Sequence, residues 1–455
     1  MKPSSVTLAE MLDARERRAD AQSALLQSAD ASCCLVSLSL NIAGDVKRTA
    51  KTRLLFDRGL DLFDRLGFDG IERRVFDRNT GTEALLLLRA DAGEVKAACE
   101  RIEDAFPAAR LYDFDVLNKD GVKLSRSVPR RCLICGGPAA DCARSRAHGL
   151  DAIKAATEAL LNEFCADTLA YAAHFALERE LRTTPKPGLV DLNNNGAHTD
   201  MDVPLFLKSA ASLVPYFKAA VLLGLKDAGM EPLQAAGLDA EHAMFAATNG
   251  VNTHKGMIYS MGLLLYGMGK ALSFGGDAVE HAAALARSDA EERLSHAKSE
   301  RDTNGAKVYS EHGARGAVGE AADGFFHALY CTDRLEAHKA SGNPGALALL
   351  DVMMILNDTN LLHRGGAEGL RFVQERAKAI AFLPESERVA AMTALDGEMI
   401  ERNLSPGGAA DVLALAYDNN ECQCPRRMEK RSKHRLWRRF KHRYHRFVLQ
   451  RCVYR

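Results

Sequence analysis

Residues 151–183 read DAIKAATEALLNEFCADTLAYAAHFALERELRT, an unbroken helical pattern in which apolar residues recur every three or four positions. This stretch separates two parts of the 455-residue chain that differ in their pattern of apolar residues. Before it, apolar runs of strand length alternate with helical patterns. After it, alanine- and leucine-rich helices continue to Tyr417, interrupted by short polar segments. We therefore expect an α/β (α+β) domain at residues 1–155 and an all-α domain at residues 156–418.

The first domain shows both periodicities. Its strand candidates are apolar or alternating runs, at residues 33–42 (CCLVSLSLNI), 82–91 (TEALLLLRAD) and 109–118 (ARLYDFDVLN). Its helix candidates are amphipathic, at residues 6–27, 48–68 and 91–106. The pattern predicts a sheet covered by helices.

Composition points to a soluble globular protein, with 47% hydrophobic and 26% charged residues. Lys plus Arg and Asp plus Glu both number 60, so the average charge indicates no class of partner. The start has no apolar core of a secretory signal. Apolar runs such as residues 213–225 contain lysine and are shorter than the roughly 20 residues of a membrane span. We expect a cytoplasmic protein without a membrane partner, whose 11 cysteines are thiols or metal ligands.

Residues 419–455 differ in composition from both domains. Residues 421–455 hold 13 Lys and Arg against two Glu, and the only Trp of the chain. We expect the preceding helix to break after Tyr417, and the tail to be disordered or non-homologous. A basic arm for nucleic acid is the alternative.

Asp113 and Asp115 lie two apart in a strand candidate, so both carboxylates point to one face of the sheet. Such a pair is a candidate Mg²⁺ site for phosphoryl or nucleotidyl transfer. Asp-x-Asp is also common on solvated strand faces, and spacing alone leaves both interpretations open.

The segment 124–148, LSRSVPRRCLICGGPAADCARSRAH, contains Cys132, Cys135, Cys142 and His148, which could supply four ligands to a structural zinc ion. Cys142 could equally be a buried thiol, and His148 a phosphate contact. Guanidinium groups match phosphate oxygens, so the arginines of this segment predict a polyanionic substrate, unless they form a solvated basic loop. These arginines are Arg126, Arg130, Arg131, Arg144 and Arg146.

The stretches SLSLNIAGDVK, ARLYDFDVLNKDG and LSRSVPRRCLICGGPAADCARSRAH resemble the transferase that attaches the prosthetic group to apo-citrate lyase. The resemblance spans about residues 5–150. It implies a nucleotidyltransferase-like domain that moves phosphoribosyl-dephospho-CoA onto a serine of the lyase's acyl carrier subunit and releases diphosphate. It also implies that Asp113 and Asp115 bind the metal of that reaction.

Five polar islands interrupt the helices of the second domain. They are TPKPGLVDLNNNGAHTDMD (184–202), TNGVNTHKG (248–256), EHGARGAVGEAADGF (311–325), LNDTNLLHRGGAEGL (356–370) and NLSPGGAAD (403–411). Each joins apolar helices, so the five could converge on one pocket at the helix ends. Glycine backbone and helix N-termini favour phosphate. The islands predict a nucleoside triphosphate site, although the chain has neither a GxxxxGK[ST] nor a GxGxxG motif.

In this order, the islands resemble triphosphoribosyl-dephospho-CoA synthase over about residues 160–417. The resemblance implies that ATP and 3′-dephospho-CoA react to give triphosphoribosyl-dephospho-CoA and adenine. That product is the substrate implied for the first domain, so the two resemblances together imply a bifunctional transferase.

The reaction implied for the second domain requires an acid, a base, phosphate-binding groups and Mg²⁺. For acid and base we predict His198, His254, Glu320 and His363. The predicted phosphate or substrate contacts are Lys186, Asn194, Asn252, Lys255, Arg315, Asn360 and Arg364. The predicted Mg²⁺ ligands are Asp200, Asp202 and Asp358.

Two alternatives remain at the level of sequence. The same synthase chemistry could serve another carrier, such as that of malonate decarboxylase. A zinc-containing protein that binds nucleic acid through the cysteine segment and the basic tail is the alternative from a different class.

Overall fold

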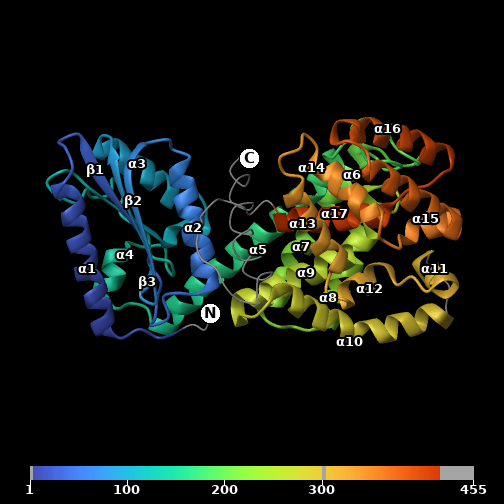
Figure 1. Ribbon diagram of the computed structural model, residues 1–455. Coiled ribbons are helices and arrows are strands. Elements are labelled where there is room, and N and C mark those ends of the chain that lie inside the picture. The colour runs from blue at the N-terminus through green and yellow to red at the C-terminus, as the bar shows by residue number, and fades with distance from the viewer. Residues whose placement is uncertain (1–3, 300–303, 421–455) are drawn as a thin grey trace. The chain divides into compact units, whose positions relative to one another are not determined.

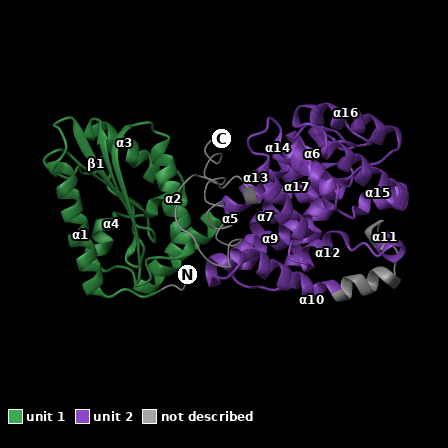
Figure 2. Ribbon diagram, viewed as in Figure 1, with its two compact units in different colours: residues 1–165 green, residues 166–455 purple. Residues whose placement is uncertain are grey.

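The computed structural model describes residues 4–299 and 304–420 (Figure 1). It divides into two compact units, residues 1–165 and residues 166–455 (Figure 2). The division falls inside α5 (Leu150–Arg182), the helix that the stretch 151–183 predicted. Because each unit has its own core, the two are described separately.

The first unit consists of helices around one sheet (Figure 1). The four strands are antiparallel throughout, in the order β2-β3-β1-β4. Its elements are α1 (Leu8–Gln27), β1 (Cys33–Leu40), α2 (Ala50–Asp64), β2 (Asp69–Arg78), β3 (Gly81–Arg89), α3 (Ala92–Glu103), the 3-10 helix η1 (Pro107–Leu111), β4 (Tyr112–Leu117), α4 (Ala139–Ser145) and the first half of α5. The helices and antiparallel sheet confirm the coarse expectation for this region.

Strand β2 is the strand that the sequence did not predict. It pairs only with β3, so it is an edge strand. None of its ten residues is buried. Its sequence DGIERRVFDR therefore lacks the apolar alternation by which a half-buried strand is recognised.

The two faces of the sheet carry different elements. Leu25 and Leu26 of α1 pack with Leu35 of β1 and Leu85 of β3 on one face. On the other face Phe114 of β4 stacks on Phe63 of α2, with ring centroids 6.0 Å apart, and α3 packs against β4. Because side chains alternate along a strand, the residues of β4 that neighbour Phe114 point to the α1 face.

The described regular structure of the second unit is entirely helical, as the sequence indicated. After the second half of α5 its helices are α6 (Val203–Ser212), α7 (Val214–Leu225), α8 (Met230–Ala247), α9 (Lys255–Phe274), α10 (Ala278–Ser299), α11 (Asn304–His312), α12 (Gly316–Ala322), α13 (Phe326–Ala337), α14 (Pro344–Met353), α15 (Thr359–Ala381), α16 (Glu385–Glu401) and α17 (Gly407–Asn420). Two clusters of buried apolar side chains make up its core.

Helices α7 and α9 form the closest packing of this core. A Cβ on Gly224 would lie 2.0 Å from the carbonyl oxygen of Tyr266, and one on Gly269 would lie 2.3 Å from that of Val221. Side chains at these positions are sterically excluded, so glycine lets the two helices approach backbone to backbone.

Two sequence expectations for this unit need correction. Helix α17 does not break after Tyr417 but continues to Asn420. The sequence analysis judged the apolar runs shorter than a membrane span, but residues 203–225 are long and apolar enough to cross a membrane by length and composition alone. In the structure they form two helices, α6 and α7, with Leu213 between them. The basic tail expected at 419–455 lies outside the described residues from position 421 onward.

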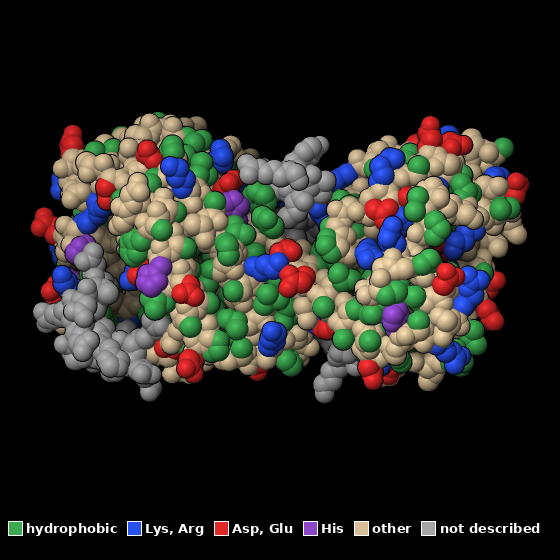
Figure 3. Space-filling view, turned by 180° about the vertical axis from the view of Figure 1, so that it is seen from behind, with side chains coloured by type: hydrophobic (Ala, Val, Ile, Leu, Met, Phe, Trp, Pro, Cys, Tyr) green, Lys and Arg blue, Asp and Glu red, His purple; other side chains and the backbone are tan. Residues whose placement is uncertain are grey.

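Basic and acidic side chains are interspersed on both units on the face drawn in Figure 3. This mixture agrees with the equal totals of 60 basic and 60 acidic residues.

Candidate active sites

Asp113 and Asp115 lie side by side on β4, on the α1 face of the sheet. Their partners across the β1–β4 ladder are Ser39 and Ser37. Asp115 is 2.5 Å from the ammonium of Lys123. Asp113 lies 3.4 Å from a guanidinium nitrogen of Arg130. The structure thus presents two adjacent carboxylates flanked by cations, a set of hard oxygen ligands that suits Mg²⁺.

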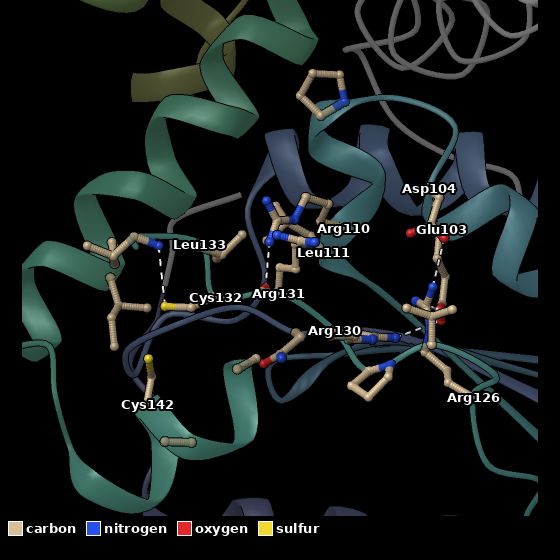
Figure 4. A pocket seen from close by; sticks show the side chains of 18 of the residues that line it. Glu103, Asp104, Arg110, Leu111, Arg126, Arg130, Arg131, Cys132, Leu133 and Cys142 are labelled. Atoms are coloured by element: carbon tan, nitrogen blue, oxygen red, sulfur yellow. Dashed lines mark hydrogen bonds and ion pairs between the residues drawn. The ribbon is translucent and has the colours of Figure 1, made fainter. Parts of the chain in front are cut away.

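The arginine loop, residues 126–131, reaches Asp113 through Arg130 and is tied to the end of α3. Arg126 donates 2.6 Å to Glu103, and Arg130 donates 2.7 Å to the other oxygen of Glu103. Glu103 is 1% exposed and also accepts the backbone N–H of Phe114. Burial raises the pKa of Glu103, against the opposing effects of the Phe114 N–H and both arginines. Glu103 therefore anchors both arginines, as Figure 4 shows.

A cavity of about 680 Å³ opens along the arginine loop (Figure 4). Arg126, Arg130 and Arg131 line it, together with Arg110. Arg110, which the sequence analysis did not select, donates 2.5 Å to the backbone oxygen of Arg131. Four guanidinium groups around one cavity can bind a polyanion such as a polyphosphate.

The other two predicted arginines do not line this cavity. Arg144 is exposed and pairs with Asp141 within α4. Arg146 has a positive φ of 50° at the end of α4 and is exposed. Arg110 could have been found from its place two residues before β4, three positions from Asp113.

The four predicted metal ligands of this unit come together in space. One ligand atom each of Cys132, Cys135, Cys142 and His148 lies within 4.8 Å of all the others. Among the described residues this is the group of His, Cys, Asp or Glu side chains that could hold a metal ion. Cys132, Cys142 and His148 also form one wall of the cavity.

In the second unit, the first polar island is built on a buried ion pair. Lys186 is 2% exposed and its ammonium contacts the carboxylate of Glu180, near the end of α5. The backbone N–H of Lys186 donates 2.9 Å to Asp191. Asp396 of α16 accepts the N–H of Gly188. These contacts fix the loop between α5 and α6 in one conformation.

Sequence reasoning selected Lys186 but missed its partners Glu180 and Asp191. It also missed Asp396, which holds Gly188 of the same loop. Glu180 was detectable as an acid in the final turn of an apolar helix, directly before the island. Asp396 lies in α16, outside every island, and no sequence signal marked it. The predicted contact Asn194 donates its side-chain amide 2.7 Å to Asp396.

Asp358 joins the beginnings of α15 and α17. Its carboxylate accepts the backbone N–H groups of Asn360 and Leu361, as the N-cap of α15, and that of Ala409 at the start of α17. Burial raises the pKa of Asp358 to about 6, against the opposing effect of these N–H groups. The two islands at 356–370 and 403–411 therefore meet at this carboxyl group.

Asp411 lies where three islands meet. A Cβ on Gly256 would lie 2.6 Å from an oxygen of Asp411. Burial raises the pKa of Asp411 to about 8, and the charges of Glu180 and Asp358 add to the effect. Because a carboxyl group with this pKa is largely protonated at neutral pH, Asp411 can donate a proton.

His198 is held between two islands. Its Nε2 is 2.9 Å from Ser405 Oγ, and its Nδ1 is 3.2 Å from a guanidinium nitrogen of Arg364. Because arginine has only donors, Nδ1 accepts and Nε2 carries the proton that it donates to Ser405. Burial lowers the pKa of His198, and the charge of Arg364 adds to this effect. In this arrangement the neutral imidazole orients Ser405.

His254 is buried at the start of α9. Its Nδ1 lies 2.7 Å from Ser209 Oγ. Burial lowers its pKa to about 3, and the charge of Lys186 adds to this effect. The imidazole is therefore neutral across the physiological range, and its contacts suit a positioning role.

Most of the remaining predicted residues have partners of their own. Lys255 pairs with Glu241, Glu320 accepts from His327 and Ala328, and Arg315 contacts Asp323. Asn252 accepts the backbone N–H of Lys255, and Asp202 caps α6 by accepting that of Leu205. The side chain of Asn360 packs directly against Gly407, where a Cβ atom would lie 2.5 Å from it. Asp200 lies 3.7 Å from His198, and His363 is exposed.

The predicted convergence of islands can be followed through contacts. Ser405 links the fifth island to the first, and Asp358 links the fourth to the fifth. A Cβ on Gly316 would lie 3.2 Å from Thr359, which joins the third island to the fourth. Among the described residues, Asp200, Asp202 and Asp358 do not form a group of three ligands.

Comparison with known proteins divides the chain at almost the same point. Residues 6–164 match the family of CitX, apo-citrate lyase phosphoribosyl-dephospho-CoA transferase, and residues 166–420 match that of CitG, ATP:dephospho-CoA triphosphoribosyl transferase.

Three relatives illustrate the similarity. Protein CitXG of Haemophilus influenzae is 35% identical over 90% of this chain and 95% of its own length. A probable 2-(5''-triphosphoribosyl)-3'-dephosphocoenzyme-A synthase of Vibrio cholerae is 41% identical over 54% of this chain and 85% of its own. The corresponding synthase of Haemophilus ducreyi is 34% identical over 62% and 97%.

Proposed function

This chain belongs to the family of fused CitX–CitG transferases, and we propose which of its residues carry each of the two reactions. It is a bifunctional enzyme, an ATP:dephospho-CoA triphosphoribosyl transferase joined to an apo-citrate lyase phosphoribosyl-dephospho-CoA transferase. The alignment with protein CitXG along both units is the observation that carries this assignment.

In the first unit, the acceptor is a serine of the citrate lyase acyl carrier subunit, and diphosphate leaves. The arginine-lined cavity supports this assignment, because Arg130 both lines it and lies 3.4 Å from Asp113. Arg110 and Arg131 bind the triphosphate, because their guanidinium groups are not committed to Glu103. Arg126 and Arg130 hold the loop in place. Mg²⁺ at Asp113 and Asp115 would neutralise the phosphate charge next to the attacking serine.

In the second unit, the ribose 2′-hydroxyl of dephospho-CoA displaces adenine from C1 of the ATP ribose. Lys186 of the first island and Arg364, which contacts that island through Ala197 and His198, supply positive charge. Asp200 and the second oxygen of Asp202, whose first oxygen caps α6, would bind Mg²⁺ together with the triphosphate. Asp358 keeps the role that its three N–H contacts indicate, which is to join α15 and α17.

Asp411 is the group that protonates the departing adenine. Its carboxyl group holds a proton at neutral pH, and it lies among the islands that carry the other polar groups. Ser405, oriented by His198, accepts a hydrogen bond from the attacking hydroxyl. The proton that this hydroxyl loses as the new C1–O bond forms passes to solvent, from which Asp411 is protonated again after it has given its proton to adenine. His254, Glu320 and His363 then support the site without transferring a proton.

The thiolate groups of Cys132, Cys135 and Cys142 and the imidazole of His148 would hold a zinc ion. Sulfur and nitrogen donors suit zinc better than Mg²⁺, and a closed set of four is typical of structural zinc sites.

Product analysis tests the assignment. The full chain is incubated with ATP, Mg²⁺ and 3′-dephospho-CoA, and free adenine is measured by chromatography. The apo acyl carrier protein of citrate lyase is then added, and its mass is followed. We expect adenine in the first step and a carrier heavier by one phosphoribosyl-dephospho-CoA group in the second.

A parallel reaction with the carrier of malonate decarboxylase decides the acceptor. Preferential modification of that carrier would contradict the citrate lyase assignment and leave the synthase assignment intact. Asp113→Asn should stop carrier modification while adenine release continues, and Asp64→Asn, an exposed acid paired with Arg73, is the matched control.

A further inference from the structure

The segment from Gly121 to Leu150 has almost no core. Of its 30 residues only Cys132 is buried, and α4 contains no buried residue. A polypeptide segment without a hydrophobic core needs another source of order, such as a disulfide or a metal. The segment nevertheless contains the arginine loop, which lines the cavity of the first unit.

The four potential ligands are arranged as a metal site requires. Cys132 and Cys135 lie on a tight hairpin, in which the N–H of Cys132 donates 2.6 Å to Gly137 and that of Gly136 donates 3.2 Å to Cys132. Gly136 has a φ of +72°, a conformation that glycine adopts without strain. The N–H of Ile134 points at Cys132 Sγ at 3.4 Å. Such N–H groups stabilise a thiolate ligand.

One further distance and one unpartnered nitrogen identify the kind of cross-link. Cys135 Sγ and Cys142 Sγ are 3.5 Å apart. This separation far exceeds the roughly 2.05 Å of a disulfide bond. Zinc–sulfur bonds of about 2.3 Å in a tetrahedral site place two sulfurs roughly 3.8 Å apart. The Nε2 atom of His148 is buried and has no hydrogen-bond partner, as expected for a nitrogen that awaits a metal.

The metal ligands continue directly into the arginine loop. Cys132 follows Arg131, and the antiparallel bridge between Arg131 and Pro138 joins the loop to the hairpin. The N–H of Ala139, at the start of α4, donates 2.9 Å to the oxygen of Arg130. At its other end the loop is held by the contacts of Arg126 and Ser127 with the end of α3.

We propose that a zinc ion bound by Cys132, Cys135, Cys142 and His148 is the cross-link that orders the arginine loop, so that the polyanion site of the first unit forms only in the metal-bound chain. This inference rests on the proposed transferase function of that unit. The second unit does not depend on this metal, so one chain contains a zinc-dependent and a zinc-independent activity.

The test compares Cys135→Ser with wild type. Cys135 is exposed, so the substitution removes a ligand without disturbing the core. Ser145→Ala, a change of an exposed residue of α4 in the same segment, is the matched control. Zinc content is measured by mass spectrometry after dialysis, and cleavage between residues 121 and 150 by limited proteolysis. Carrier modification and adenine release are assayed on the same samples.

For wild type and Ser145→Ala we expect one zinc per chain and a protected segment. For Cys135→Ser we expect zinc affinity to fall by about tenfold or more, and cleavage within the segment. Carrier modification should fall about 10- to 100-fold because the arginines lose their positions. Adenine release should not change. His148→Ala should reproduce the pattern, and Co²⁺ added to the metal-free chain should give the absorption of tetrahedral thiolate coordination.

Two results would overturn the inference. One is a wild-type chain that holds no metal, takes up neither Zn²⁺ nor Co²⁺, and is already protected from protease. The other is loss of zinc in Cys135→Ser with unchanged proteolysis and carrier modification. If the zinc-bound wild type modifies no carrier, the proposed function fails instead, while metal content and proteolysis still decide whether zinc orders the loop.

Discussion

The buried ion pair between Lys186 and Glu180 gives a quantitative prediction for the substitution Lys186→Met. Lys186 is 2% exposed and Glu180 is 7% exposed. Methionine keeps the length of the aliphatic chain and removes the charge, so the carboxylate of Glu180 is left buried without its cation. Loss of one partner of a buried pair typically costs about 3–5 kcal/mol.

The cost has an upper limit, because Glu180 can take up a proton. The ordinary pKa of this carboxyl is 4.5. Protonating such a group at a pH of about 7 costs roughly 3.4 kcal/mol, at about 1.36 kcal/mol per pH unit. We therefore expect Lys186→Met to destabilise the second unit by about 3 kcal/mol at neutral pH. The folded pKa of Glu180 then lies above the unfolded value, so this penalty shrinks as the pH falls toward 4.5.

The double variant Glu180→Gln/Lys186→Met separates the ion pair from the site. It leaves no buried charge, so it should be more stable than either single variant. Urea denaturation of the full chain, followed by far-UV circular dichroism, measures all four stabilities, because the helical second unit dominates that signal. If the two single effects simply add, or if each is below about 0.5 kcal/mol, the pair does not stabilise the loop in the way described. Adenine release by the double variant then reports whether Lys186 also contacts the triphosphate.

Four further predictions concern the two acids on β4, Asp411 and the basic tail. Asp113→Asn and Asp115→Asn should each reduce carrier modification by about 100-fold or more, whereas Asp64→Asn should not; equal losses in all three would mean that the two acids on β4 have no special role. Burial raises the pKa of Asp411 to about 8, so the rate of adenine release should fall as the pH rises above about 8, and Asp411→Asn should be slow at every pH. The raised pKa also means that the contribution of Asp411 to stability is fully present below the ordinary value of 3.8 and is lost as the pH rises through about 8. A thermal melt series in which the difference between wild type and Asp411→Asn changes with pH in the opposite direction would contradict this. Removal of residues 419–455 should leave both activities intact, and loss of soluble protein on truncation would overturn that expectation.

The elements predicted from sequence were those with a strong apolar pattern. Strand β1, in which six of eight residues are buried, and the long helix α5 were both recognisable from periodicity. Strand β2 was not, because an edge strand without buried residues carries no such signal. The end of α17 was misjudged because the charged sequence that follows it suggested a break, whereas the helix continues for three residues beyond Tyr417.

The sequence indicated which residues belong to the candidate sites, but not how those residues are placed relative to one another. The four metal ligands of the first unit lie within 17 residues, so a local loop was enough to bring them together. The second unit combines residues far apart in sequence, such as His198 and Ser405, or Asp358 and Ala409. Their polar, glycine-containing segments were visible, but their pairing depends on helix packing. Asp396 could not be found, because it lies in an ordinary amphipathic helix.

Helix α5 determines how the gene of such a protein can be divided. Phe164, Cys165 and Ala166 are all buried at the point where the two units meet in the sequence. The first half of the helix holds Lys51 through Glu158 and Asn162, and the second half ends with Glu180 against Lys186. A cut at this point would leave each half with a truncated helix and a newly exposed apolar end. Separate production of the two activities therefore requires that both gene fragments encode the whole of α5, so that the helix is duplicated rather than shared.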